Sequence, residues 1–179
     1  MHRIVPDIDT LEQHLNQLTI NPERYRPAQC QSCGLKGVWA HGYYVRKCDR
    51  GLPEHGAKNT IPIPRYYCPG CHHTCSRLPS CVAPRRWYLW WVQQQALLAL
   101  LLGDPVRAVS RRFMPGRHTL RRWLAWLHQK DLGYRFTLAT HFTTLGHHQW
   151  WGDYWHQAMS SQGLDVLMAT LDRDGLCIP

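Results

Sequence analysis

Four cysteines at paired spacing are the residues of this chain whose types could do metal chemistry. Two C-x-x-C pairs occur, and 34 residues separate them. Zn²⁺ takes four thiolates in a tetrahedral arrangement, and two such pairs supply them when the chain folds back on itself. Four thiolates saturate the ion and leave no position for a reactive water, so we expect a structural site that holds one zinc ion. The predicted ligands are Cys30, Cys33, Cys68 and Cys71.

Other interpretations of the cysteines stay open. The two pairs can act as redox sites, or the four thiols can be buried without a metal. Cys75 is expected to be a buried thiol. The roles of the other cysteines are open: Cys48, Cys81 and Cys177. Three nearby histidines compete for a ligand position: His41, His72 and His73.

Short strands must position the two cysteine pairs. Residues 38–47 are rich in β-branched and aromatic side chains and predict a strand. Residues 60–67 predict a second strand, of the edge type because its prolines exclude a central position in a sheet. An amphipathic helix is expected over 7–18, with Asp7 or Asp9 as its N-cap. We therefore predict an N-terminal helix and lead-in at 1–27 and a zinc ribbon of short antiparallel strands at 28–82.

Helices dominate the remainder, so the expected fold class is α+β, mainly α. A helix-turn-helix bundle is predicted at 83–133, with Met114-Pro115-Gly116 as its short, glycine-containing turn. Asp104 is the expected N-cap of its second helix, and Gly133 is expected beyond the end of its third. Extra helices at 134–179 either pack on this bundle or form a dimerisation surface. The expected helices span 84–102, 105–113, 117–130, 148–160 and 163–173.

Positive charge is concentrated between residues 65 and 135. The formal net charge of the chain is +9, and this segment carries twelve Lys and Arg against only Asp104 and Asp131. Such a field attracts a polyanion, and Arg binds phosphates and guanine edges with two hydrogen bonds. A solvated basic face that aids solubility is the alternative. The predicted DNA-binding residues are Arg85, Arg86, Arg107, Arg111, Arg112, Arg117, His118, Thr119, Arg121 and Arg122.

The order of motifs along residues 21–130 resembles that of a known family. The chain carries C-x-x-C-G at 30–34, H-G-Y-Y-x-R at 41–46 and T-L-R-R-W at 119–123. The string R-Y-Y-C-P-x-C-x-x-x-C-S-x-L-P at 65–79 is the most specific, with Cys75 where an aromatic residue is usual. These motifs resemble the zinc-ribbon and helix-turn-helix region of bacterial insertion-sequence transposases and of InsA-like transposition-associated proteins. The resemblance implies recognition of DNA, commonly the ends of the element, and repression of the element's own expression.

Catalytic residues are not expected in this chain. The transposases that this chain resembles cut DNA with carboxylates that hold Mg²⁺ ions on an RNase-H-like sheet. That domain needs far more residues than the sequence has after the predicted helix-turn-helix. Only 49 residues follow Lys130, and their pattern predicts helices rather than the strands of such a sheet. A single-strand nuclease with a His-x-His metal site is a poor match to His147, His148 and Tyr154. The late carboxylates are expected on the surface: Asp153, Asp165, Asp172 and Asp174.

These features together predict a sequence-specific double-stranded DNA-binding protein of a mobile element, either a transposition accessory factor or a repressor. A zinc-ribbon adaptor that docks on a transposase or polymerase is one alternative, and the non-catalytic N-terminal part of a longer transposase is another. The expected partners are double-stranded DNA and either a transposase or a second copy of the chain, with no membrane and no small-molecule substrate. The apolar run at 87–102 is short and no secretory signal is seen, so we expect a bacterial cytoplasmic, nucleoid-associated protein.

Overall fold

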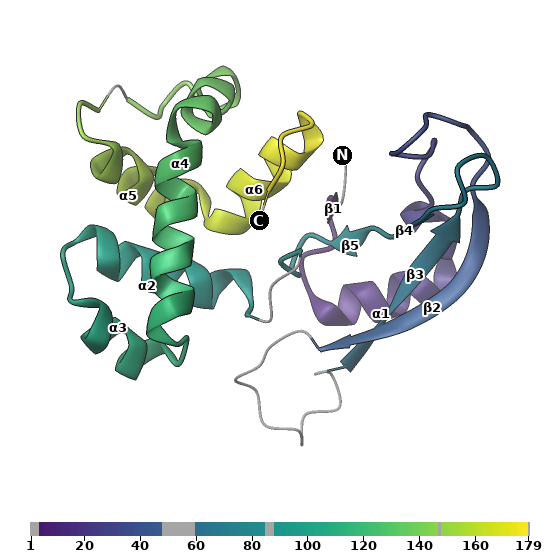
Figure 1. The fold of residues 1–179 in the computed structure, drawn as a ribbon, viewed down its shortest axis with the longest axis horizontal. Helices are drawn as coiled ribbons and strands as arrows, with labels where there is room; N and C mark the ends of the chain where they lie inside the picture. The colour runs from purple at the N-terminus through teal and green to yellow at the C-terminus, as the bar shows by residue number, and fades with distance from the viewer. Residues whose placement is uncertain (1–3, 48–59, 85–87, 147, 179) are drawn as a thin grey trace. The chain divides into compact units, whose positions relative to one another are not determined.

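The computed structural model describes residues 4–47, 60–84, 88–146 and 148–178. Its chain divides into two compact units, Met1–Tyr88 and Leu89–Pro179. Within the described residues the fold is mixed α and β, with six α-helices and two small sheets (Figure 1). The first unit holds both sheets and one α-helix, and the second unit holds the other five α-helices.

The larger sheet is antiparallel and has the strand order β2-β3-β4. Its strands are β2 (Trp39–Lys47), β3 (Thr60–Tyr67) and β4 (Thr74–Cys75). β3 is the central strand, so the prediction of an edge strand at 60–67 is wrong. β4 pairs only with Tyr66 and Tyr67. At Pro62 and Pro64, β3 therefore pairs with β2 alone, and its other side has no strand partner that would need a proline N–H.

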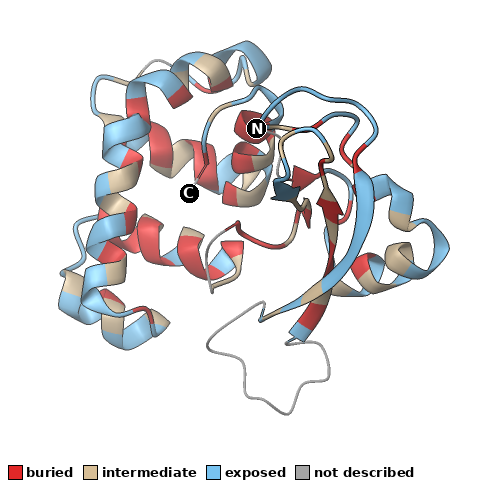
Figure 2. Cartoon of the chain, turned by 45° about the vertical axis from the view of Figure 1, so that its right-hand side comes forward, coloured by how far each residue is buried: buried red, intermediate tan, exposed pale blue. Residues whose placement is uncertain are grey.

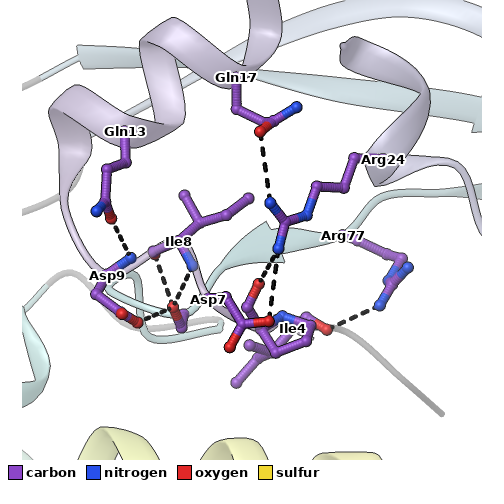
Figure 3. Close-up of polar contacts among 10 residues, drawn as sticks. Ile4, Asp7, Ile8, Asp9, Gln13, Gln17, Arg24 and Arg77 are labelled. Atoms are coloured by element: carbon purple, nitrogen blue, oxygen red, sulfur yellow. Dashed lines mark hydrogen bonds and ion pairs between the residues drawn. The ribbon is translucent and has the colours of Figure 1, made fainter.

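The smaller sheet ties the start of the chain to the segment that follows β4. It pairs β1 (Ile4–Val5) with β5 (Leu78–Pro79) in parallel. Arg77 donates a hydrogen bond to the Ile4 carbonyl (3.0 Å), and Arg24 donates to the Pro6 carbonyl (3.1 Å; Figure 3). Arg24 also forms an ion pair with Asp7 at 3.5 Å. Residues 4–7 are therefore held by contacts to Arg24 and Arg77 within this unit.

The helix predicted at 7–18 is α1 (Leu11–Ile20), and its N-cap is Thr10, not Asp7 or Asp9. Thr10 and Gln13 form a capping box, in which the Gln13 amide donates to Thr10 Oγ1 (3.1 Å) and Gln13 Oε1 accepts from the Thr10 amide (3.1 Å). The Asp9 carboxylate instead accepts a hydrogen bond from the Ser80 hydroxyl at 2.7 Å. The reciprocal pair therefore sets the start of the helix. After α1 ends, a 3₁₀-helix spans Pro22–Tyr25.

The core of the first unit lies between α1 and the larger sheet and includes two of the predicted ligands. Figure 2 shows buried residues on β3 beside the long, mainly exposed β2. Cys30 and Cys68 of the predicted site are thus part of the buried apolar core, and Cys71 packs against it. The buried cluster comprises Val5, Ile8, Tyr25, Cys30, Val38, Tyr66 and Cys68.

The regular structure described in the second unit is all α-helical. Two predicted boundaries in it are wrong: α2 begins six residues later than 84, and α3 has Pro105 rather than Asp104 as N-cap. Because Pro105 has extended backbone and supplies no side-chain acceptor, the helix begins without a polar cap. The helices are α2 (Trp90–Leu101), α3 (Val106–Phe113), α4 (Arg117–His141), α5 (Trp151–Gln162) and α6 (Leu164–Arg173).

α4 continues through Gly133, where we expected the helix to have ended, and reaches His141. A glycine inside a helix costs about 0.5–1 kcal/mol relative to alanine, which apolar burial outweighs. The buried face of α4 continues past the glycine, because Leu127, Tyr134 and Leu138 are all at most 2% exposed. A single glycine therefore does not end this helix.

The last two helices pack on α2 and α4 within the second unit. Trp155 donates a hydrogen bond to the Asp131 carboxylate (2.8 Å), and the Leu164 amide donates to Gln94 Oε1 (2.7 Å). Met159 and Leu167 are fully buried. Asp172 on α6 is only 1% exposed, so the expectation that it lies on the surface is wrong, because this position of α6 faces the core. These helices therefore complete the core of the unit. Among the described helices, none combines the length and the apolar character that a membrane crossing requires.

Candidate metal centre

Each cysteine pair lies on a tight turn, and the two turns share one hydrogen-bond pattern. The amide of Gly34 donates to the Cys30 carbonyl at 2.9 Å, and the amide of His72 donates to the Cys68 carbonyl at 2.9 Å. The amides of Cys30 and Cys68 in turn donate to the carbonyls five residues further on. The two pairs are thus presented by equivalent backbone loops.

The residue after each pair has left-handed backbone. Gly34 has φ +76°, a conformation that glycine adopts without strain, and His72 has φ +59° at the equivalent place. A histidine in this conformation carries backbone strain that a glycine avoids. The His72 ring accepts or donates a hydrogen bond with the Tyr67 hydroxyl, which helps to hold it there.

The four predicted cysteines meet in space. The Sγ atoms of Cys30 and Cys71 are 3.5 Å apart, and those of Cys33 and Cys68 are 3.6 Å apart. All four sulfur atoms lie within 4.8 Å of one another. A tetrahedral Zn²⁺ site with Zn–S bonds of about 2.3 Å requires S···S separations of about 3.8 Å. The donor set and its spacing therefore fit one structural metal ion.

Backbone amides prepare one of the ligands for metal binding. The Ser32 amide lies 3.4 Å from Cys30 Sγ. Hydrogen bonds from the backbone of Cys33 and Ser32 lower the pKa of the Cys30 thiol to about 6. Because the thiolate is the form that binds metal, Cys30 is a competent ligand at neutral pH.

The competing ligands lie outside the cluster. Among the described residues, the group that could hold a metal contains the four thiols and no histidine. Cys75 is half-buried against the core of the first unit, and burial raises the pKa of its thiol. Among the described residues, no disulfide joins the cysteines. Cys48 lies outside the described residues.

A buried histidine beneath the larger sheet was not anticipated from the sequence. His14 on α1 is 0% exposed; its Nδ1 lies 2.6 Å from the Tyr25 hydroxyl and its Nε2 lies 2.9 Å from the Pro62 carbonyl. Burial lowers the pKa of His14, an effect that the hydrogen bond to Pro62 opposes. Its position beside Leu11 and Leu18 on the apolar face of α1 is the signal that could have revealed it.

In the second unit, the basic residues that were predicted to contact DNA are exposed to solvent. α3 and α4 are joined by Met114-Pro115-Gly116; Met114 has φ +69°, and the Ser110 hydroxyl donates to the Pro115 carbonyl at 2.9 Å. Val109, Leu120 and Trp123 are buried, whereas Val106 and Phe113 are only half-buried. Arg85 and Arg86 lie outside the described residues. The exposed residues are Arg107, Arg111, Arg112, Arg117, His118, Arg121 and Arg122, and Thr119 is half-buried.

The fold and the site define the class of this chain: a two-unit α/β protein with a candidate four-thiolate metal centre in its first unit. The chain belongs to the DUF6431 family, a domain of unknown function, whose model matches residues 30–123. The match begins at the first ligand and ends inside α4, so it covers the cysteine cluster, α3 and only the start of α4. A search of curated proteins found no match, and a search of solved structures found none.

Proposed function

We propose that the chain is a sequence-specific double-stranded DNA-binding protein in which a structural zinc ribbon accompanies a basic helix-turn-helix. α3 is the first helix of the motif, residues 114–116 are its turn, and the N-terminal part of α4 is the recognition helix. Helices of this kind enter the major groove with their first residues at the base edges. The bacterial mobile-element context, with a role as transposition accessory factor or repressor at the nucleoid, rests on the motif resemblance.

The observation that carries the proposal is the separation of faces on α3 and α4. Leu120 and Trp123 are directed into the core, while Arg121 and Arg122 between them are exposed. Residues 105–130 contain no carboxylate. Among the described residues, no carboxylate forms an ion pair with the arginines of this segment, so their charge is available to a polyanion.

The charge predicts a specific salt response. Six exposed arginines lie on α3 and the first turns of α4, and each phosphate that they neutralise adds about −0.9 to the slope of log K against log salt. A contact set of this size loses about a thousandfold in affinity between 50 and 200 mM salt. The arginines are Arg107, Arg111, Arg112, Arg117, Arg121 and Arg122.

The metal is assigned as Zn²⁺ because four thiolates in a tetrahedron suit zinc or iron–sulfur chemistry, and a closed site with equivalent loops suits a structural ion. Elemental analysis of the purified protein should give one zinc per chain, and the solution should be colourless. Iron with visible thiolate-to-metal absorption would contradict the assignment.

Charge reversal tests the DNA proposal. Fluorescence anisotropy with a mixed-sequence duplex should show that Arg121→Glu binds at least tenfold more weakly than wild type at low salt. Arg173→Glu, an exposed single charge reversal on α6, is the matched control and should bind as wild type does. Equal affinity for wild type and Arg121→Glu, or a flat salt response, would refute duplex binding through α4 and favour an adaptor role.

A further inference from the structure

One face of the larger sheet carries a row of aromatic rings beside the candidate metal centre. The ring centroid of Tyr67 lies 6.2 Å from that of Trp39, 5.7 Å from that of His41 and 6.0 Å from that of His72. Further along the same face, the Arg65 guanidinium lies 5.3 Å from the centroid of the Tyr44 ring. We call this surface the ring face: Trp39, His41, Tyr44, Arg65, Tyr67 and His72.

A β-bulge in β2 assembles the ring face. Trp39 is paired with Tyr67 and Tyr43 with Pro64, and the register shifts between Ala40 and Tyr43. Side chains alternate along a strand, so Pro64 and Tyr67, three residues apart, point to opposite faces, and so do their partners. Gly42 has φ +71°, which permits the extra residue of the bulge. Without the bulge, Trp39 and Tyr43 would share a face.

The rings of this face are not used by the core. Trp39 is 60% exposed, and His41 and His72 are exposed as well. Tyr66, the neighbour of Tyr67 on β3, is by contrast buried in the core cluster. The ring pairs are tilted by 36° to 49°, so they do not stack flat on one another. The exposed rings of Trp39, His41 and His72 are therefore accessible to a planar ligand, with the half-buried Tyr67 among them.

The charge around the ring face favours an anionic ligand. Described residues 24–47 and 60–84 contain no carboxylate side chain, and Asp7 and Glu23, outside these ranges, form ion pairs with Arg24 and Arg26. Aromatic side chains interleaved with cations, and without acidic neighbours, are what single-stranded nucleic acids require: bases stack on the rings and phosphates meet the cations. Apart from Arg24 and Arg26, the cations of these residues are Lys36, Arg46, Lys47, Arg65 and Arg77, and Arg65 lies on the ring face itself.

We propose that the ring face binds single-stranded DNA, with unpaired bases stacked on Trp39 and Tyr67 and with Arg65 directed to the backbone phosphates. Sheets that present rings in this way stack two or three bases. A duplex does not fit this surface, because its bases are already stacked on one another. This activity is separate from duplex binding by α4, and it gives the chain a surface for unwound or end-frayed DNA.

The test uses the full, metal-loaded chain and a fluorescein-labelled oligothymidylate, followed by fluorescence anisotropy. Trp39→Ala and Tyr67→Ala should each weaken binding about fivefold or more, as loss of one stacked base requires. Tyr43→Ala is the matched control, because Tyr43 is a 56% exposed aromatic residue on the opposite face of the same strand. Its affinity should equal that of wild type. Zinc content and thermal unfolding identify any variant that fails to fold.

Three results would overturn the proposal. Wild type could fail to bind the oligothymidylate, folded Trp39→Ala could bind as wild type does, or Tyr43→Ala could lose as much affinity as Trp39→Ala. Failure here is distinguishable from failure of the duplex proposal. We expect Arg121→Glu to keep its affinity for the single strand, and we expect Trp39→Ala to keep its affinity for the duplex.

Discussion

Loss of the metal should unfold the first unit of the chain and leave the second unit folded. Structural zinc sites contribute about 10–16 kcal/mol of apparent binding free energy, which is as large as the whole stability of a typical domain, about 5–15 kcal/mol. Cys30 and Cys68 also belong to the buried core cluster, so an unfilled site disturbs apolar packing directly. The second unit has its own buried core around Leu120, Trp123 and Trp155 and contains none of the four ligands.

Hydrogen exchange with mass spectrometry measures this directly. After removal of the metal by a chelator, or in Cys68→Ser, the amides of β2 and β3 should exchange rapidly while those of α4 keep their protection. Cys177→Ser is the matched control, because this exposed thiol is not a ligand. Cys75→Ser should lower the stability only mildly, because that thiol is half-buried and outside the cluster. Protection of β2 and β3 that persists without metal would refute the structural role of the site.

Three further predictions concern single side chains. Tyr25→Phe removes the partner of His14 Nδ1 and should cost about 1–3 kcal/mol in urea unfolding of the metal-loaded protein, because a buried polar atom is left unpaired; an unchanged midpoint would contradict the pairing. His14 has a pKa below its ordinary value of 6.5, so the unfolded chain binds the proton first as the pH falls. The stability difference between wild type and His14→Leu should therefore shrink below pH 6.5, by at most about 1.4 kcal/mol per pH unit, and a constant difference would contradict this. Gly133→Ala should stabilise the second unit by about 0.5–1 kcal/mol in thermal unfolding, because the glycine is exposed inside α4 with open space around its Cα; destabilisation would show that the glycine is required.

Local chemistry made much of the first unit predictable. Two C-x-x-C pairs are typical of a metal site, and the β-branched and aromatic runs at 38–47 and 60–67 identified both long strands. The central place of β3 was not predictable, because it depends on β4, a strand of two residues whose pairing is tertiary. The burial of His14 was not predictable for the same reason, because the tertiary fold alone brings its partners Tyr25 and Pro62 to it.

Helix ends were the least predictable feature of the second unit. Gly133 and Asp104 are residues that often mark helix boundaries, and neither does so here. In α4 the burial of Tyr134 and Leu138 decides where the helix ends, and the sequence shows that burial only when α5 and α6 are in place. The ring face was hidden because a bulge reverses which side chains share a face.

Selection of duplex fragments from the source genome by the metal-loaded chain tests the central proposal most directly. We expect wild type to enrich fragments with a common short sequence, and we expect Arg121→Ala to lose this enrichment while Arg173→Ala keeps it. Recovery of fragments without a common sequence, or the same enrichment by wild type and Arg121→Ala, would contradict recognition of duplex DNA by α4.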